Sequence, residues 1–315
     1  MSGRIVTLGE TMALFRAVHV GSLATETDFR LGVGGAESNV AIALSRLGAD
    51  ATWLGRVGSD GLGERVLREL RAENVDVRGI IDPQASTGLM VKESRTETAT
   101  RVLYYRAGSA GSRLTVDDLA AADIPGAALL HVTGITPALS ESAAAAVSAA
   151  VDLAVEDGIP VSFDINHRSS LWVGRDSTAV YRDLAARSTI VFAGDEEARL
   201  IAPDAATPSE LARAIADLGP TQVVIKLGAE GCLALIDGVE YSRAAVKIRP
   251  VDTVGAGDAF VAGYLAELIA GLPVEDRLTT AVTTGAFACL NHGDWEGFAR
   301  RSELALLTAT EPVTR

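Results

Sequence analysis

The stretch best suited to chemistry is residues 251–260, VDTVGAGDAF, in which two glycines and an alanine precede an acidic residue and an apolar segment. Glycine lets the backbone turn tightly and lets a ligand approach the N–H groups. The first turn of a helix has unpaired N–H donors and a partial positive charge, so this stretch predicts an anion site suited to phosphate. Asp258 lies in the predicted first turn. Its carboxylate either accepts a proton from an attacking hydroxyl or only caps the helix, and both interpretations stay open.

Two further glycine loops stand next to predicted elements. Residues 32–39, GVGGAESN, open a predicted helix and either hold a ligand near the backbone or form a plain strand-to-helix turn. Residues 224–231, VIKLGAEG, read as a buried strand followed by a Gly-x-x-Gly turn. The carboxyl end of a parallel strand is a usual place for a ligand. A simple turn into the next strand, residues 232–236, is the alternative.

Two arginines stand at the ends of predicted strands. Arg106 follows a pair of tyrosines, and Arg168 follows the segment FDINH. The guanidinium group can pair with a carboxylate or a phosphate through two parallel hydrogen bonds. The alternative for each is an ordinary solvated charge.

Several familiar sites are excluded by the pattern. The chain has no G-x-x-x-x-G-K-[ST] motif and no G-x-G-x-x-G after a strand, which argues against a Walker P-loop and a dinucleotide-binding enzyme. Cys232 and Cys289 lie far apart and form neither a disulfide framework nor a CxxC motif. The four histidines show no metal-ligand spacing.

The elements that must position these residues alternate between short apolar runs and segments of helical period. That alternation predicts βαβ units and a mostly parallel sheet. The predicted strands are residues 5–8, 52–57, 129–132, 161–165, 190–192 and 223–226. One predicted helix begins near residue 36 and ends at Gly48. Four others span residues 60–74, 140–156, 257–270 and 274–290.

Two regions break the alternation. Residues 13–29 have mixed character, while residues 87–91 and 98–105 predict a hairpin with a polar turn at residues 94–97. Neither region fits a βαβ crossover. They either form a small separate sheet that acts as a lid, or the hairpin is an ordinary surface feature.

Composition narrows the class of protein. The chain has 315 residues, 48% of them hydrophobic, and a net charge of −13. So acidic a protein argues against nucleic-acid binding, which relies on basic patches. The longest apolar stretch, residues 256–272, is interrupted by Asp258 and Glu267, which argues against a membrane span. We expect a cytoplasmic protein.

The two glycine-rich motifs together resemble the signatures of the PfkB/ribokinase family of sugar kinases. Residues 34–41, GGAESNVA, and residues 252–258, DTVGAGD, occur in the family's order near the two ends of the chain. Within the family the chain is most similar to 2-keto-3-deoxygluconate kinases. The supporting stretches are residues 101–106 (RVLYYR), 108–112 (GSAGS), 134–140 (GITPALS), 164–168 (DINHR) with 171–172 (LW), and 293–297 (GDWEG).

The resemblance implies one ribokinase-like kinase domain over residues 1–315. Its fold would be a three-layer α/β/α sandwich around a mostly parallel sheet, with a small β-sheet lid from about residues 13–29 and 87–106. The implied reaction is phosphorylation of 2-keto-3-deoxygluconate to its 6-phosphate by ATP with Mg²⁺. Because lids in this family often pair between subunits, the resemblance also implies a homo-oligomer.

The resemblance also assigns roles to residues. Asp258 would be the general base. Gly255, Ala256 and Gly257 would form the anion hole around the transferred phosphoryl group. The substrate would contact Gly35, Tyr104, Arg106, Arg168 and Asp294. The nucleotide site would include Asn166, Lys226, Gly228 and Gly231. No metal ligand is assigned.

Three positions depart from the family pattern. The wider family often has Asn-x-x-Glu where this chain has GDEE at residues 194–197, so Glu197 is kept without the Asn. Glu37 replaces a Pro or Gly of many relatives, and Met90 stands where some of these kinases have a substrate-contacting Tyr.

A neutral-sugar kinase, such as a fructokinase or ribokinase, is therefore the alternative enzyme. A sugar or nucleotide sensor without catalysis is the alternative from another class. The sequence leaves open the C4 epimer, the nucleotide, the subunit count, a monovalent-cation requirement and any role of Glu197 in holding Mg²⁺.

Overall fold

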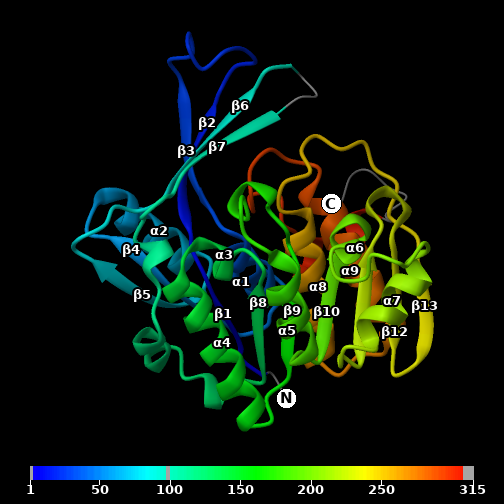
Figure 1. The fold of residues 1–315 in the computed structure, drawn as a ribbon. Coiled ribbons are helices and arrows are strands. Elements are labelled where there is room, and N and C mark those ends of the chain that lie inside the picture. Colours follow the sequence, from blue (N-terminus) through cyan, green and yellow to red (C-terminus); the bar gives the residue numbers. More distant parts are fainter. Residues whose placement is uncertain (1–2, 97–99, 308–315) are drawn as a thin grey trace.

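The computed structural model describes residues 3–96 and 100–307, and a nine-stranded sheet runs through the middle of the molecule (Figure 1). Its strands, in spatial order, are β13 (Val239–Arg243), β12 (Cys232–Ile236), β11 (Gln222–Lys226), β10 (Ile190–Gly194), β9 (Val161–Asp164), β8 (Leu129–Thr133), β1 (Ile5–Leu8), β4 (Ala51–Gly58) and β5 (Asp76–Asp82). The strands from β11 to β5 pair in parallel, while β12 and β13 are antiparallel additions at one edge.

Helices cover both faces of this sheet, which makes three layers. The helices are α1 (Ala36–Arg46), α2 (Gly61–Ala72), α3 (Thr136–Leu139), α4 (Glu141–Glu156), α5 (Ser177–Ala186), α6 (Asp195–Arg199), α7 (Pro208–Ala216), α8 (Ala256–Ile269) and α9 (Val274–Ala288). One hydrophobic core joins α1, α2, α8 and α9 to the sheet, and a second joins α4, α5 and α7 to the opposite face. Ile5 lies in the first core and its neighbour Val6 in the second, because side chains alternate along a strand.

The predicted helix boundaries have identifiable chemical causes. The Asp60 side chain accepts the Gly63 N–H at 2.8 Å and begins α2. Ser140 accepts the Ala143 N–H at 3.0 Å and begins α4. Gly48, with φ of +84°, follows the end of α1 in a conformation that favours glycine.

A second sheet of four strands projects from the side of the molecule at which the parallel strands end (Figure 1). Its order is β3 (Phe29–Gly34), β2 (Met12–Ala17), β6 (Leu89–Ser94) and β7 (Thr100–Tyr105). The predicted hairpin is therefore no isolated surface feature, because β6 pairs in parallel with β2. This smaller sheet is called the small sheet below.

The boundaries of the small sheet differ from the sequence prediction. Residues 13–29 contain most of β2, a connecting loop and the first residue of β3, and β3 continues to Gly34 inside the predicted glycine loop. Ser94, predicted to start the turn, is the last residue of β6. Positions 97–99, in the predicted turn and strand start, lie outside the described residues.

Both the mostly parallel sheet with its two helical layers and the added small sheet confirm the predicted fold class. The sequence analysis missed β5, β13 and helices α3, α5, α6 and α7. In the described part of the chain, no helix has the length and apolar character needed to cross a membrane.

Candidate active site

Two cavities meet at the carboxyl ends of the parallel strands. The first, of about 390 Å³, is lined by Met90, Val102 and Tyr104 of the small sheet and by residues of the main body below it. The second, of about 560 Å³, lies against α8 and α9 beside the turn that follows β11. Three residues line both cavities: Lys226, Thr253 and Gly257.

Every residue predicted from the sequence to form a site lines one of these cavities. The first cavity is lined by Gly35, Tyr104, Arg106, Asn166, Arg168, Lys226, Gly255, Gly257, Asp258 and Asp294. The second is lined by Lys226, Gly228, Gly231, Ala256 and Gly257. Asn166, which the resemblance places along the nucleotide, lies instead in the first cavity and not among the residues lining the second.

The loop that enters α8 turns sharply at Gly255, the N-cap residue, where φ is +77°. A Cβ atom at this position would come within 2.0 Å of the Asp294 carbonyl oxygen, so both conformation and space require glycine. The Ala256 N–H donates to the Thr253 carbonyl at 3.3 Å. At Gly257 a Cβ atom would point toward the Lys226 Nζ, 3.7 Å away. The Cα of Gly257 therefore faces the junction of the two cavities.

Asp258 is buried in the first turn of α8 and does not cap it. Its Oδ2 accepts a hydrogen bond from Asn39 Nδ2 at 2.8 Å, and its Oδ1 accepts one from Asn166 Nδ2 at 3.4 Å. Burial raises the pKa of Asp258 to about 7, against the opposing effects of Asn39 and Arg168. A carboxyl group that titrates near neutral pH is suited to accept a proton.

Lys226, at the end of β11, forms an ion pair with Asp164, at the end of β9. Its Nζ lies 2.7 and 2.9 Å from the two carboxylate oxygens. Burial lowers the pKa of Lys226, but the nearby Asp164 and Glu197 carboxylates raise it by more. The side chain therefore keeps its positive charge at the cavity junction.

Glu197 holds two strand ends together. Its Oε1 accepts the His167 N–H at 2.9 Å, and its Oε2 accepts the Gly194 N–H at 2.7 Å. Each carboxylate oxygen thus already has a backbone partner, so Glu197 fixes the ends of β9 and β10 beside Asp164.

The two predicted arginines have different environments. The Arg106 Nε donates to Glu10 Oε2 at 2.6 Å, and both side chains are buried. Arg168 is exposed and donates to the His167 carbonyl at 3.0 Å. No carboxylate of the described residues pairs with Arg168, so its charge is available to an anion in the first cavity.

Asp294 completes the first cavity under the small sheet. A Cβ atom on Gly34 would lie 2.2 Å from Asp294 Oδ2, so the absence of a side chain at Gly34 admits this carboxyl group. Burial raises the pKa of Asp294 to about 7, while the Lys92 ammonium group opposes that shift.

Sequence reasoning gave no role to five polar residues of the first cavity: Glu10, Glu37, Asn39, Asp164 and Thr253. Glu10 follows the end of β1 by two residues, and a position just past a parallel strand was the available signal. Glu37 was noted as a departure, and its Oε1 accepts hydrogen bonds from Thr133 and Thr136 at 2.6 Å each. The contact of Asn39 with Asp258 spans 219 positions and leaves no mark in local spacing.

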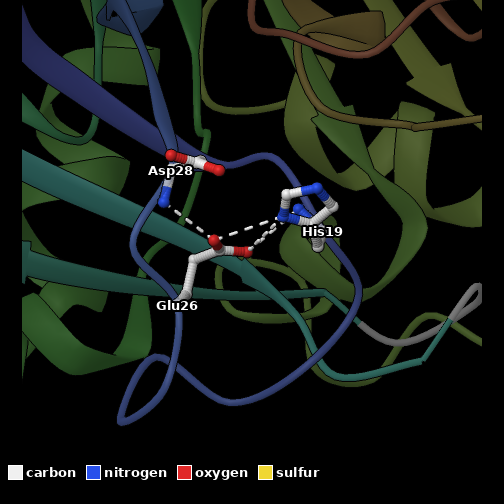
Figure 2. Close-up of side chains that lie close together, drawn as sticks. All are labelled: His19, Glu26 and Asp28. Carbon is white, nitrogen blue, oxygen red and sulfur yellow. Dashed lines mark hydrogen bonds and ion pairs between the residues drawn. The ribbon is translucent and has the colours of Figure 1, made fainter.

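One group of potential metal ligands lies away from both cavities, in the loop between β2 and β3. Figure 2 shows His19, Glu26 and Asp28 drawn together there. The Glu26 carboxylate accepts backbone N–H groups from Asp28 at 2.8 Å, Thr27 at 2.9 Å and His19 at 3.0 Å. These hydrogen bonds, that of Asp28 first, lower the pKa of Glu26 to about 2. Glu26 therefore stabilises the loop between β2 and β3 through these backbone hydrogen bonds.

Comparison with known proteins finds relatives along nearly the whole chain. Residues 2–298 match the model of the pfkB family carbohydrate kinases. The chain is 38% identical over 305 residues to a 2-dehydro-3-deoxygluconokinase of Bacillus subtilis, covering 95% of this chain and 94% of the relative. It is 34% identical over 296 residues to a 2-dehydro-3-deoxygalactonokinase of Haloferax volcanii, covering 93% of each.

A similar fold occurs in an uncharacterised sugar kinase of Pyrococcus horikoshii that was solved in complex with ATP. The TM-score is 0.83 at 26% identity, and the match covers 96% of this chain and 97% of that one.

The burial of Asp258 predicts a measurable effect on stability. A carboxyl group whose pKa rises on folding from 3.8 to about 7 destabilises the fold increasingly as the pH rises across that range. Asp258→Asn removes the ionisable group at nearly constant size. We expect its melting temperature to exceed that of the wild type by at least about 3 °C at pH 8, and by clearly less at pH 5.

Differential scanning fluorimetry at the two pH values measures this difference. Asp204→Asn, at an exposed position outside both cavities, is the control. It should leave the melting temperature unchanged at both pH 5 and pH 8. An equal gain at both pH values, or no gain at pH 8, would contradict the raised pKa.

Proposed function

The chain belongs to the pfkB family of carbohydrate kinases, and we propose that it transfers the γ-phosphoryl group of ATP to 2-keto-3-deoxygluconate, giving the 6-phosphate and ADP. This acceptor is the 2-dehydro-3-deoxy sugar acid in the name of the Bacillus subtilis relative. The observation that carries the proposal is the position of Asp258, buried in the first cavity beside the residues that this cavity shares with the second one.

The geometry supports proton transfer by Asp258. In the proposed reaction its carboxylate accepts the proton of the acceptor hydroxyl while that oxygen attacks phosphorus. Asn39 and Asn166 hold the two carboxylate oxygens, which fixes the direction in which the carboxylate faces. A base with a pKa near 7 combines a large ionised fraction with useful proton affinity at neutral pH.

The start of α8 supports binding of the transferred phosphoryl group. Gly255, Ala256 and Gly257 form its first residues, where backbone N–H groups and the helix dipole favour negative charge. The Ala256 N–H already has a carbonyl partner, so we assign the larger share of phosphoryl contacts to Gly257 and its neighbours. Lys226 adds a fixed positive charge on the opposite side of the junction.

The second cavity supports a nucleotide. Apolar side chains such as Val246, Ile248 and Val282 suit the adenine ring, while Lys226 and Lys247 suit phosphates. No carboxylate is found among its described lining residues, and the nearby Asp164 and Glu197 already have partners. These residues fit a Mg²⁺ held mainly by phosphate oxygens and water, which would neutralise part of the phosphate charge.

The first cavity is lined by five carboxyl groups and three cations, so the preference for an acid over a neutral sugar rests on the one cation with no described carboxylate partner. The protein carries a net charge of −13, so an anionic acceptor needs local cations to bind. Arg168 lines the cavity with no described carboxylate partner, while Arg106 lines it beside Tyr104 and is ion-paired with Glu10. A neutral acceptor, as in the fructokinase or ribokinase alternative, does not need these cations.

The base assignment predicts a large loss of rate. Asp258→Asn keeps the size of the side chain but cannot accept the proton, so we expect kcat to fall by about 10²–10⁴-fold. Binding of ATP, measured by calorimetry, should stay within about threefold of wild type. Near-normal turnover in a coupled ADP-release assay would remove Asp258 from the mechanism.

The substrate class is tested with a panel of sugars and sugar acids and with two arginine variants. Charge-assisted hydrogen bonds contribute roughly 1.5–3 kcal/mol, about 10- to 150-fold in binding. We expect Arg168→Met and Arg106→Met to raise the KM for 2-keto-3-deoxygluconate within that range, with little change in the KM for ATP. In Arg106→Met the unpaired Glu10 carboxylate would repel the substrate as well.

Arg199→Met, an exposed site on α6, is the matched control and should leave both constants unchanged. Preference of the wild type for fructose or ribose, or unchanged selectivity in both cavity variants, would favour the neutral-sugar kinase.

Assembly of two or more copies is part of the same proposal. The small sheet exposes Phe29 and Tyr105, with Tyr105 61% accessible, and aromatic side chains of this kind are enriched at interfaces. We expect a homo-oligomer, and light scattering of the purified protein measures the subunit count. A monomer at micromolar concentration would contradict this expectation. A cytoplasmic location also stays a prediction.

A further inference from the structure

A buried lysine connects the small sheet to the loop that enters α8. Lys92 lies on β6, two residues after Met90, and residues two apart on a strand share a face. Met90 lines the first cavity, and only 3% of the Lys92 side chain is exposed. Its Nζ forms an ion pair with Asp252 Oδ2, and the Asp252 side chain is 8% exposed.

Asp252 connects the Lys92 ammonium group to the backbone of the loop that enters α8. Its other oxygen, Oδ1, accepts the Val254 N–H at 3.2 Å, immediately before Gly255. The N–H groups of Val251 and Asp252 donate to the Cys289 carbonyl at 2.8 and 3.3 Å. The loop is therefore anchored on one side to the end of α9 and on the other, through a single carboxylate, to the small sheet.

The charges around this ion pair show why a cation is needed there. The carboxylates of Glu296, Asp258 and Asp252 add to the burial that raises the pKa of Asp294, and the Lys92 ammonium group opposes them. Removing one partner of a buried ion pair leaves the other charge uncompensated. Without Lys92, we expect the uncompensated Asp252 carboxylate to turn toward water and to lose the hydrogen bond that it accepts from the Val254 N–H.

We propose that Lys92 is a positioning residue for phosphoryl transfer: through Asp252, it holds residues 253–257 in the conformation that receives the phosphoryl group only when the small sheet lies over the first cavity. Lys92 touches neither reactant in this proposal. It makes the anion hole depend on the position of the small sheet. The inference rests on the proposed kinase function, but not on the identity of the acceptor.

The test measures kcat and KM separately for Lys92→Met and Asp252→Asn. A displacement of about 1 Å at a catalytic group can lower a rate about 100-fold. We expect each variant to lower kcat about 10- to 100-fold and to leave the KM for acceptor and for ATP within about threefold. The double variant should lower kcat no further than one single variant, because the two residues act as one unit.

Arg101→Met is the matched control, since Arg101 is an exposed cation on β7 of the same small sheet, and it should behave as wild type. Lys92→Gln keeps a hydrogen-bond donor of similar reach, so it should give an intermediate kcat. It replaces Lys92→Met in the comparison if that variant does not fold.

A second measurement does not depend on the acceptor. Hydrogen exchange of the backbone amides of residues 252–258 should become faster in Lys92→Met than in Arg101→Met. Additive kcat effects, a raised KM with unchanged kcat, or unchanged exchange would overturn the role of Lys92. If the wild type phosphorylates only neutral sugars, the sugar-acid assignment fails while the Lys92 test stands. If it phosphorylates no sugar, the proposed function fails and the exchange experiment alone decides the coupling.

Discussion

The arrangement of the site depends on one constraint: the Asp258 carboxyl group has to be buried and yet remain able to ionise. Water would stabilise its charge but would also compete with the acceptor for the phosphoryl group. The protein replaces water by the side-chain amides of Asn39 and Asn166, which donate hydrogen bonds without adding charge. Burial raises the pKa of Asp258 to about 7, and the hydrogen bond from Asn39 opposes that rise.

The three cations that line the first cavity near Asp258 differ in whether a carboxylate partner holds them in place. Lys226 is paired with Asp164 and keeps its charge at the cavity junction. Arg106 is paired with Glu10, while Arg168 has no described carboxylate partner and faces the first cavity. The pairing fixes two of the cations in place, which favours a preorganised site over one that must assemble around each substrate.

The small sheet is a part of this site, since it supplies one wall of the first cavity and, through Lys92, an anchor for the loop before α8. Its outer surface is more exposed and carries aromatic side chains. One short sheet thereby faces the acceptor on one side and solvent, or a second copy of the chain, on the other.

Local patterns in the sequence determined most of the fold. Apolar runs located β1, β4, the hairpin of β6 and β7 and the strands from β8 to β11, and Gly48, Asp60 and Ser140 marked helix ends, because these signals act within a few residues. The two glycine motifs identified Asp258 and the start of α8 in the same way. The tertiary structure decided the partners of the charged side chains in the site. Asn39 donates a hydrogen bond to Asp258, while Arg106 pairs with Glu10 and Lys92 with Asp252. These contacts join residues 96 to 219 positions apart, and no local spacing encodes them. They arise because parallel strands bring their carboxyl ends to one edge of the sheet, where burial and charge then select the partners.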